Sequence, residues 1–104
     1  MEQALIVHLP LSNDSFGSIG EREALYALQD EMARAIEDAA AGEFDGDEFG
    51  EGECVLYMYG PDADRLFAVI KPILTSSPLA ATGYAIKRYG EAADPEAREV
   101  RVAW

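Results

Sequence analysis

The segment of residues 53–59, Glu-Cys-Val-Leu-Tyr-Met-Tyr, is apolar at both its even-numbered and its odd-numbered positions. Successive side chains of a strand point to opposite faces, so a strand of this composition has two faces to cover. A short apolar run that is rich in β-branched and aromatic residues is typical of a strand with neighbours on both sides. We therefore predict a sheet in which residues 53–59 form an interior strand.

Four further segments have the pattern of strands. Residues 43–49 are joined to the interior strand by the turn Gly50-Glu51-Gly52, which indicates a hairpin. Phe44 and Phe49 are an odd number of positions apart, so we expect a bulge at Gly46 to bring both rings to the core side. The remaining strands are predicted at residues 4–9, 82–89 and 99–104.

Two segments have the period of amphipathic helices. Ser18 and Glu21 have the spacing of a capping box, and apolar residues then recur every three or four positions until Gly42, which we expect to end the first helix. Pro61 is expected at the first position of the second helix. Pro72 lies within the second apolar pattern, so the sequence predicts that this helix kinks or ends near Lys71.

The order of these elements defines the expected fold. We predict a single domain over residues 1–104 with the order β-α-β-β-α-β and one further strand. Both helices would cover one face of a four- or five-stranded antiparallel sheet. The predicted fold is therefore an α+β, ferredoxin-like two-layer sandwich.

The stretch Leu56-Tyr-Met-Tyr-Gly-Pro-Asp-Ala63 resembles that of small uncharacterised bacterial proteins with the ferredoxin-like β-α-β-β-α-β order, over about half of the chain. The resemblance implies the fold, and no activity comes with it.

Charge divides the chain into two parts. The net charge is −12, and residues 1–60 hold fourteen Asp and Glu against two Arg, whereas residues 61–104 hold six charges of each sign. Such a field repels nucleic acid and anionic lipid, and it attracts a basic protein. No stretch is long enough and apolar enough for a spanning helix, so we expect neither a nucleic-acid nor a membrane partner.

The densest acidic segment is the predicted edge arm. Glu43, Asp45, Asp47, Glu48 and Glu51 stand there without a base among them, and we predict that they bind a basic partner. A solvated edge strand, charged against aggregation, is the alternative interpretation. Specific calcium binding is not expected, because Phe49 stands where an oxygen ligand would be needed.

A small-ligand pocket is the second candidate site. His8 is the only histidine, and with Tyr57 and Tyr89 it could line a pocket between the sheet and the loop of residues 10–17. A packed structural histidine is the competing interpretation. The sequence offers no catalytic constellation, metal site or cofactor motif. The single cysteine, Cys54, fits the core of a protein in a reducing compartment, so we expect the cytoplasm.

The sequence is compatible with three functions. The leading hypothesis is a non-catalytic acidic module that docks a basic protein, as an inhibitor or immunity-type protein would. An enzyme or small-ligand sensor that uses the pocket around His8 is the first alternative. The second is a homo-oligomer, formed either through exposed tyrosines or between the acidic arm and the basic C-terminal hairpin with its Lys87, Arg88, Arg98 and Arg101.

Overall fold

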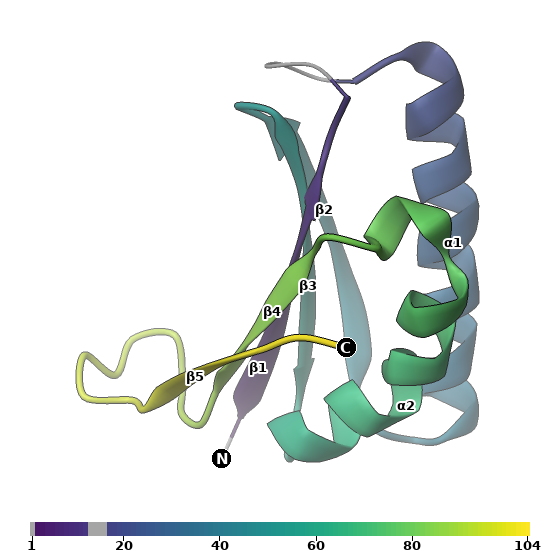
Figure 1. Cartoon of the computed structure of the whole chain (residues 1–104). Coiled ribbons are helices and arrows are strands. Elements are labelled where there is room, and N and C mark those ends of the chain that lie inside the picture. The colour runs from purple at the N-terminus through teal and green to yellow at the C-terminus, as the bar shows by residue number, and fades with distance from the viewer. Residues whose placement is uncertain (1, 13–16) are drawn as a thin grey trace.

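The computed structural model describes residues 2–12 and 17–104 and places in them five strands, two long helices and one short 3-10 helix (Figure 1). In chain order they are β1 (Gln3–Pro10), α1 (Ile19–Asp38), β2 (Glu43–Gly50), β3 (Glu53–Gly60), α2 (Ala63–Ser76), η1 (Pro78–Ala80), β4 (Tyr84–Arg88) and β5 (Glu99–Val102).

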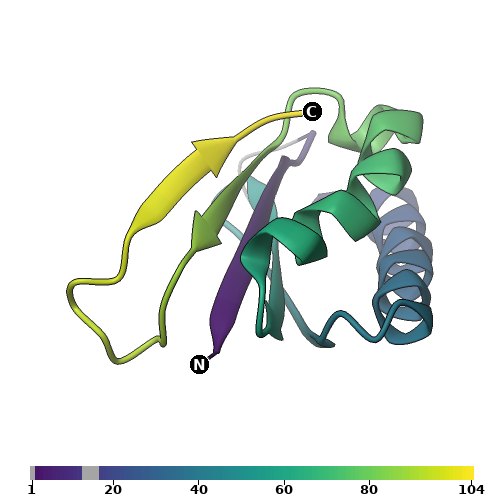
Figure 2. The same ribbon diagram turned by 90° about the horizontal axis from the view of Figure 1, so that it is seen from below.

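The strands form one antiparallel sheet, and both helices pack on the same face of it (Figure 2). The strand order is β2-β3-β1-β4-β5. The predicted α+β architecture of two helices on an antiparallel sheet is thus confirmed, with five strands. As predicted from its two apolar faces, β3 has a neighbouring strand on either side.

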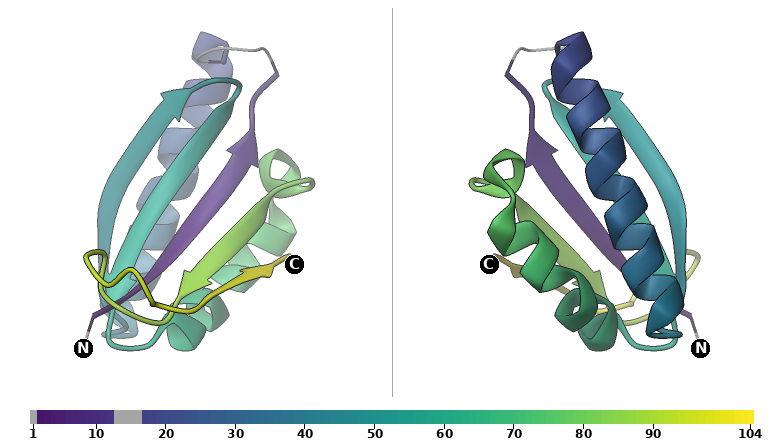
Figure 3. Two further views of the ribbon diagram at one scale, coloured as in Figure 1. Left: turned by 90° about the vertical axis from the view of Figure 1, so that its left-hand side faces the viewer. Right: turned by 90° about the vertical axis from the view of Figure 1, so that its right-hand side faces the viewer.

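The hydrophobic core fills the space between the sheet and the helices. Alternate residues of β1 and β3 point into it and meet the apolar faces of both helices. Its largest fully buried side chains are Leu5, Leu9, Leu25, Met32, Ile36, Leu56, Met58, Leu66, Ile70 and Leu74. No helix of the described residues lies on the other side of the sheet, which we call the open face (Figure 3).

The first helix begins as predicted and ends differently. The Ser18 hydroxyl accepts a hydrogen bond from the Glu21 N–H at 3.1 Å, and the Glu21 carboxylate accepts one from the Ser18 N–H, which is a complete capping box. The left-handed residue after the helix is Ala40, with φ 50°, rather than Gly42. Gly42 is instead needed for a close backbone approach to Gly60.

The second helix corrects two expectations. Asp62 is its N-cap and accepts from two backbone N–H groups, so Pro61 lies before the helix rather than at its first position. The helix also continues through Pro72 to Ser76. Pro72 and Ala68, whose carbonyl loses its partner, are both exposed, so the missing hydrogen bond leaves no buried group unpaired.

The predicted bulge in β2 is present. The pairing of β2 with β3 shifts between Phe44 and Gly46, which leaves Asp45 as the extra residue. Phe44 pairs with Met58 and Phe49 with Cys54, and both rings pack against the core. The bulge therefore resolves the odd spacing of the two phenylalanines.

Candidate functional site

The predicted acidic site lies on an edge of the sheet, because β2 pairs only with β3. Glu43, Asp45, Asp47, Glu48 and Glu51 are all exposed. None of the five forms an ion pair with a residue that the structure describes. An edge strand also leaves a row of backbone N–H and C=O groups without a neighbouring strand. Free charge and free backbone hydrogen-bonding groups therefore occur together along β2.

The acidic side chains of β2 point to both sides of the sheet. Glu48 pairs with Val55 and shares its side, which is the open face. Asp47 pairs with Leu56, whose side chain lies in the core, so Asp47 projects toward the helix side at the edge. The neighbouring residues Asp47 and Glu48 thus present equal charges in opposite directions.

The basic side chains after position 60 are, by contrast, engaged within the molecule. Lys87 forms an ion pair with Asp64 at 2.9 Å, and Arg88 forms one with Glu99 at 3.0 Å. The other four each contact a carbonyl or an aromatic ring: Arg65 donates to the Ala39 carbonyl, Lys71 lies over Phe67, Arg98 over Tyr89 and Arg101 over Tyr84. The positive charge is therefore held in internal contacts while the negative charge of β2 faces solvent.

Arg88 organises the loop of residues 90–98. Its guanidinium donates to the carbonyl oxygens of Glu91 (2.9 Å), Ala92 and Asp94 while it pairs with Glu99. These bonds hold the loop over one end of the open face, near the start of β1 (Figure 3). That end of the face is therefore covered by the chain itself.

His8 belongs to a row of rings on the open face. Its imidazole stacks on the Tyr84 ring with centroids 4.6 Å apart and planes within 6°. On one side its Nδ1 lies 3.2 Å from an oxygen of Glu53. The Arg101 guanidinium lies 3.8 Å from the centroid of the Tyr84 ring. His8 is thus packed between partners, with 20% of its side chain exposed.

The structure does not bring His8, Tyr57 and Tyr89 together. Tyr57 lines a small cavity of about 70 Å³ on the open face, with Ile6, Tyr59 and Arg88 among its other walls. Neither His8 nor Tyr89 lines it. The Tyr89 hydroxyl donates to Asp64 of α2 at 2.6 Å. Residues 13–16 of the loop that was expected to close the pocket, including Phe16, lie outside the described part of the chain.

Tyr57, Tyr89 and Cys54 all have raised pKa values. Burial raises the pKa of Tyr57, and the hydrogen bond to Asp64 raises that of Tyr89. Burial raises the pKa of the Cys54 thiol to about 12, so it is protonated at neutral pH. Residues 2–12 and 17–104 contain no group of three His, Cys, Asp or Glu side chains arranged to hold a metal ion.

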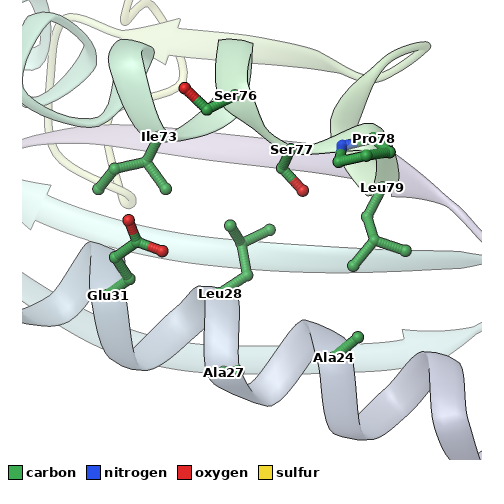
Figure 4. A pocket seen from close by; sticks show the side chains of 9 residues that line it. All are labelled: Ala24, Ala27, Leu28, Glu31, Ile73, Ser76, Ser77, Pro78 and Leu79. Atoms are coloured by element: carbon green, nitrogen blue, oxygen red, sulfur yellow. The ribbon is translucent and has the colours of Figure 1, made fainter.

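A groove between the two helices was not predicted from the sequence. It has a volume of about 300 Å³ and lies between the first half of α1 and the end of α2 (Figure 4). Ala24 and Ala27 form its floor on α1, and their small side chains leave the space open. Ile73 and Leu79 face them, and Glu31 with Ser76 supplies polar atoms at the rim. The signal in the sequence was the pair of alanines at positions that face α2.

Comparison of the chain with models of protein families, with curated proteins and with solved structures finds no significant match. No helix in the described part of the chain is both long enough and apolar enough to cross a membrane.

Proposed function

We propose that this domain is a non-catalytic protein-binding module that presents β2 and the β2–β3 turn to a basic protein. The observation that carries the proposal is the contrast between free acids and engaged bases. Among the described residues, no cation pairs with the carboxylates of Glu43, Asp45, Asp47, Glu48 and Glu51, whereas all six bases after position 60 already have partners. A basic surface would find unpaired charge along one edge.

The partner would be recognised by charge and by its backbone. Unpaired carboxylates at the rim of an interface mainly raise the association rate and select the sign of the partner's charge. The free edge of β2 could also accept an extended basic segment as an additional strand. An inhibitor or immunity-type protein that covers the basic surface of an enzyme would act in this way, and a reducing compartment such as the cytoplasm suits the buried free thiol of Cys54.

We also infer that the scaffold is a ferredoxin-like sandwich with an appended strand. In support, the first four strands have the spatial order β4-β1-β3-β2 and a helix follows both β1 and β3. The fifth strand extends this order beyond β4. The fifth strand pairs with β4, whereas β2 keeps its place at an edge of the sheet.

The proposal is tested by comparing two triple variants in affinity capture from a native lysate at low and moderate salt. The site variant Asp45→Asn/Asp47→Asn/Glu51→Gln should lose a basic partner that the wild-type protein retains at low salt and releases as salt rises. The control Glu23→Gln/Asp30→Asn/Glu31→Gln removes the same charge from exposed positions of α1 away from β2 and should keep that partner.

If both triple variants lose the partner equally, net charge and not β2 determines binding. If the wild-type protein captures no basic protein at either salt concentration, the docking function is wrong.

A further inference from the structure

The part of the open face that the loop of residues 90–98 leaves free carries charge of opposite sign at its two sides. Glu48, Val55, His8 and Tyr84 lie opposite one another on successive strands β2, β3, β1 and β4. The Arg101 guanidinium continues this row beyond the Tyr84 ring. The row therefore begins with an unpaired carboxylate, passes over apolar and aromatic side chains, and ends with a guanidinium that has no carboxylate partner among the described residues.

This row is symmetric about β1 except for the sign of its charges. His8 is on the central strand, and the carboxylate and the guanidinium lie on strands that are two positions away on either side of it. A two-fold axis parallel to β1 would place a second copy face to face with the first and exchange the two sides. Glu48 of one copy would then lie opposite Arg101 of the other, twice in each dimer.

The alternative two-fold axis in the plane of the sheet is disfavoured by the same charges. An axis perpendicular to the strands that runs along this row would place β2 over β2, and Glu48 would face Glu48. The unfavourable free energy of two like charges in direct opposition is several times larger than the favourable free energy of an ion pair at the rim of an interface. The charge pattern therefore favours one arrangement of a second copy over the other.

The centre of the row has the composition of an interface. Ile6, Tyr57 and Ile86 form the next row along the strands, where Gly90 and Ala92 of the loop share a cavity with Ile6 and Tyr57. The free centre of the face is therefore the ring stack of His8 and Tyr84. Tyrosine and arginine around an apolar centre are enriched at protein interfaces. The loop of residues 90–98 stands over the other end of the face, so contact would be closest at the end where β1 finishes (Figure 3).

We propose that this face binds a second copy of the chain, in a two-fold dimer whose axis runs along β1 and whose Glu48 and Arg101 side chains pair across the interface. The dimer does not depend on the proposed docking function, because Asp47 points to the helix side of β2 and remains available to another partner.

Sedimentation equilibrium of the full chain between about 5 and 500 µM tests the proposal, since specific dimers of modest interface commonly form within this range. The wild-type protein should be dimeric in the upper part of the range. Glu48→Arg and Arg101→Glu should each raise the dimer dissociation constant at least about 30-fold, because each places like charges in opposition twice. An equimolar mixture of the two variants should form a heterodimer, because both pairs are then attractive again.

Asp47→Arg is the matched control. It makes the same charge change one residue away, on the side of β2 that faces away from the partner, and should leave the dimer intact. A wild-type protein that stays monomeric throughout the range overturns the proposal. So does a dimer that survives both reversals, or a pair of reversals whose mixture stays monomeric while circular dichroism shows both variants folded.

Discussion

The backbones of Gly42 and Gly60 approach each other closely where the chain leaves α1 and passes the end of β3. A Cβ atom added to Gly42 would lie 2.9 Å from the Gly60 Cα and closer still to the Tyr59 carbonyl oxygen. Gly42 also has φ 148°, a conformation that residues with side chains rarely adopt. The two backbone segments are therefore in direct contact, with no room for a side chain between them.

Gly42→Ala and Gly60→Ala should therefore lower the free energy of unfolding by about 2–4 kcal/mol each, because the new methyl group meets backbone atoms that cannot move away. Urea denaturation followed by circular dichroism measures the effect. Gly20→Ala is the control: it is exposed, an added Cβ has no atom within 4 Å, and it should raise the free energy of unfolding by up to about 1 kcal/mol. Equal effects at all three positions would contradict this close contact.

Gln29 is buried on α1, and its Nε2 has no hydrogen-bond partner among the described residues. Gln29→Met keeps the length of the side chain and removes the unpaired donor, so it should raise the free energy of unfolding by about 1–2 kcal/mol. Gln29→Ala removes the same donor but leaves a cavity, and it should be less stable than Gln29→Met. If the methionine variant proves less stable than the wild-type protein in urea, the amide has a partner after all.

Cys54 should react with thiol reagents only when the protein unfolds. With a pKa of about 12 the thiol is almost entirely protonated at pH 8, and alkylation by iodoacetamide should be on the order of 1000-fold slower than for the same chain in 8 M urea. Mass spectrometry of timed samples gives both rates. Rapid labelling of the folded protein would show that the thiolate is accessible.

The Asp64 cluster should make stability depend on pH in the acid range. The Tyr89 hydroxyl and the Lys87 ammonium hold the pKa of Asp64 below its ordinary value of 3.8. A carboxyl group whose pKa is lower in the folded state stabilises the protein fully at pH values above its unfolded-state pKa. This stabilisation is lost as the pH falls through the folded-state pKa. The urea concentration at the unfolding midpoint should therefore decrease as the pH is lowered below about 4. The decrease should be steeper in the wild-type protein than in Asp64→Asn.

Part of that fall belongs to Glu21, whose pKa is lowered by its hydrogen bonds with Ser12. The Asp64→Asn variant retains the contribution of Glu21. The slope of its urea midpoint against pH is therefore the reference from which the contribution of Asp64 is measured. Identical slopes for the two proteins would mean that the Tyr89 and Lys87 contacts do not persist in solution.

Features set by neighbouring residues could be predicted from the sequence. The capping box of Ser18 and Glu21 depends on a three-residue spacing, and the bulge at Gly46 follows from the spacing of Phe44 and Phe49. The α+β architecture with both helices on one face of the sheet follows from the order of such elements. Each of these signals lies within a few residues of the structure it determines.

Features that depend on distant parts of the chain could not be predicted in this way. The helix passes Pro72 because tertiary packing places that residue on its exposed side, which the local proline rule does not include. The stack of His8 on Tyr84 joins strands that are far apart in the sequence, and its register is set by the whole sheet. The residues of the acidic site on β2 were predicted from the sequence. The position of β2 at an edge of the sheet became clear only from the strand order.

The position of β2 at an edge of the sheet also affects the tendency of this protein to aggregate. Its exposed edge would invite stacking with β2 of other molecules into fibres, and two features oppose this: the mutual repulsion of its carboxylates and the irregular backbone at Asp45. Salt screens the first and not the second. At high ionic strength, therefore, the extra residue Asp45 is the feature that still opposes stacking at this edge.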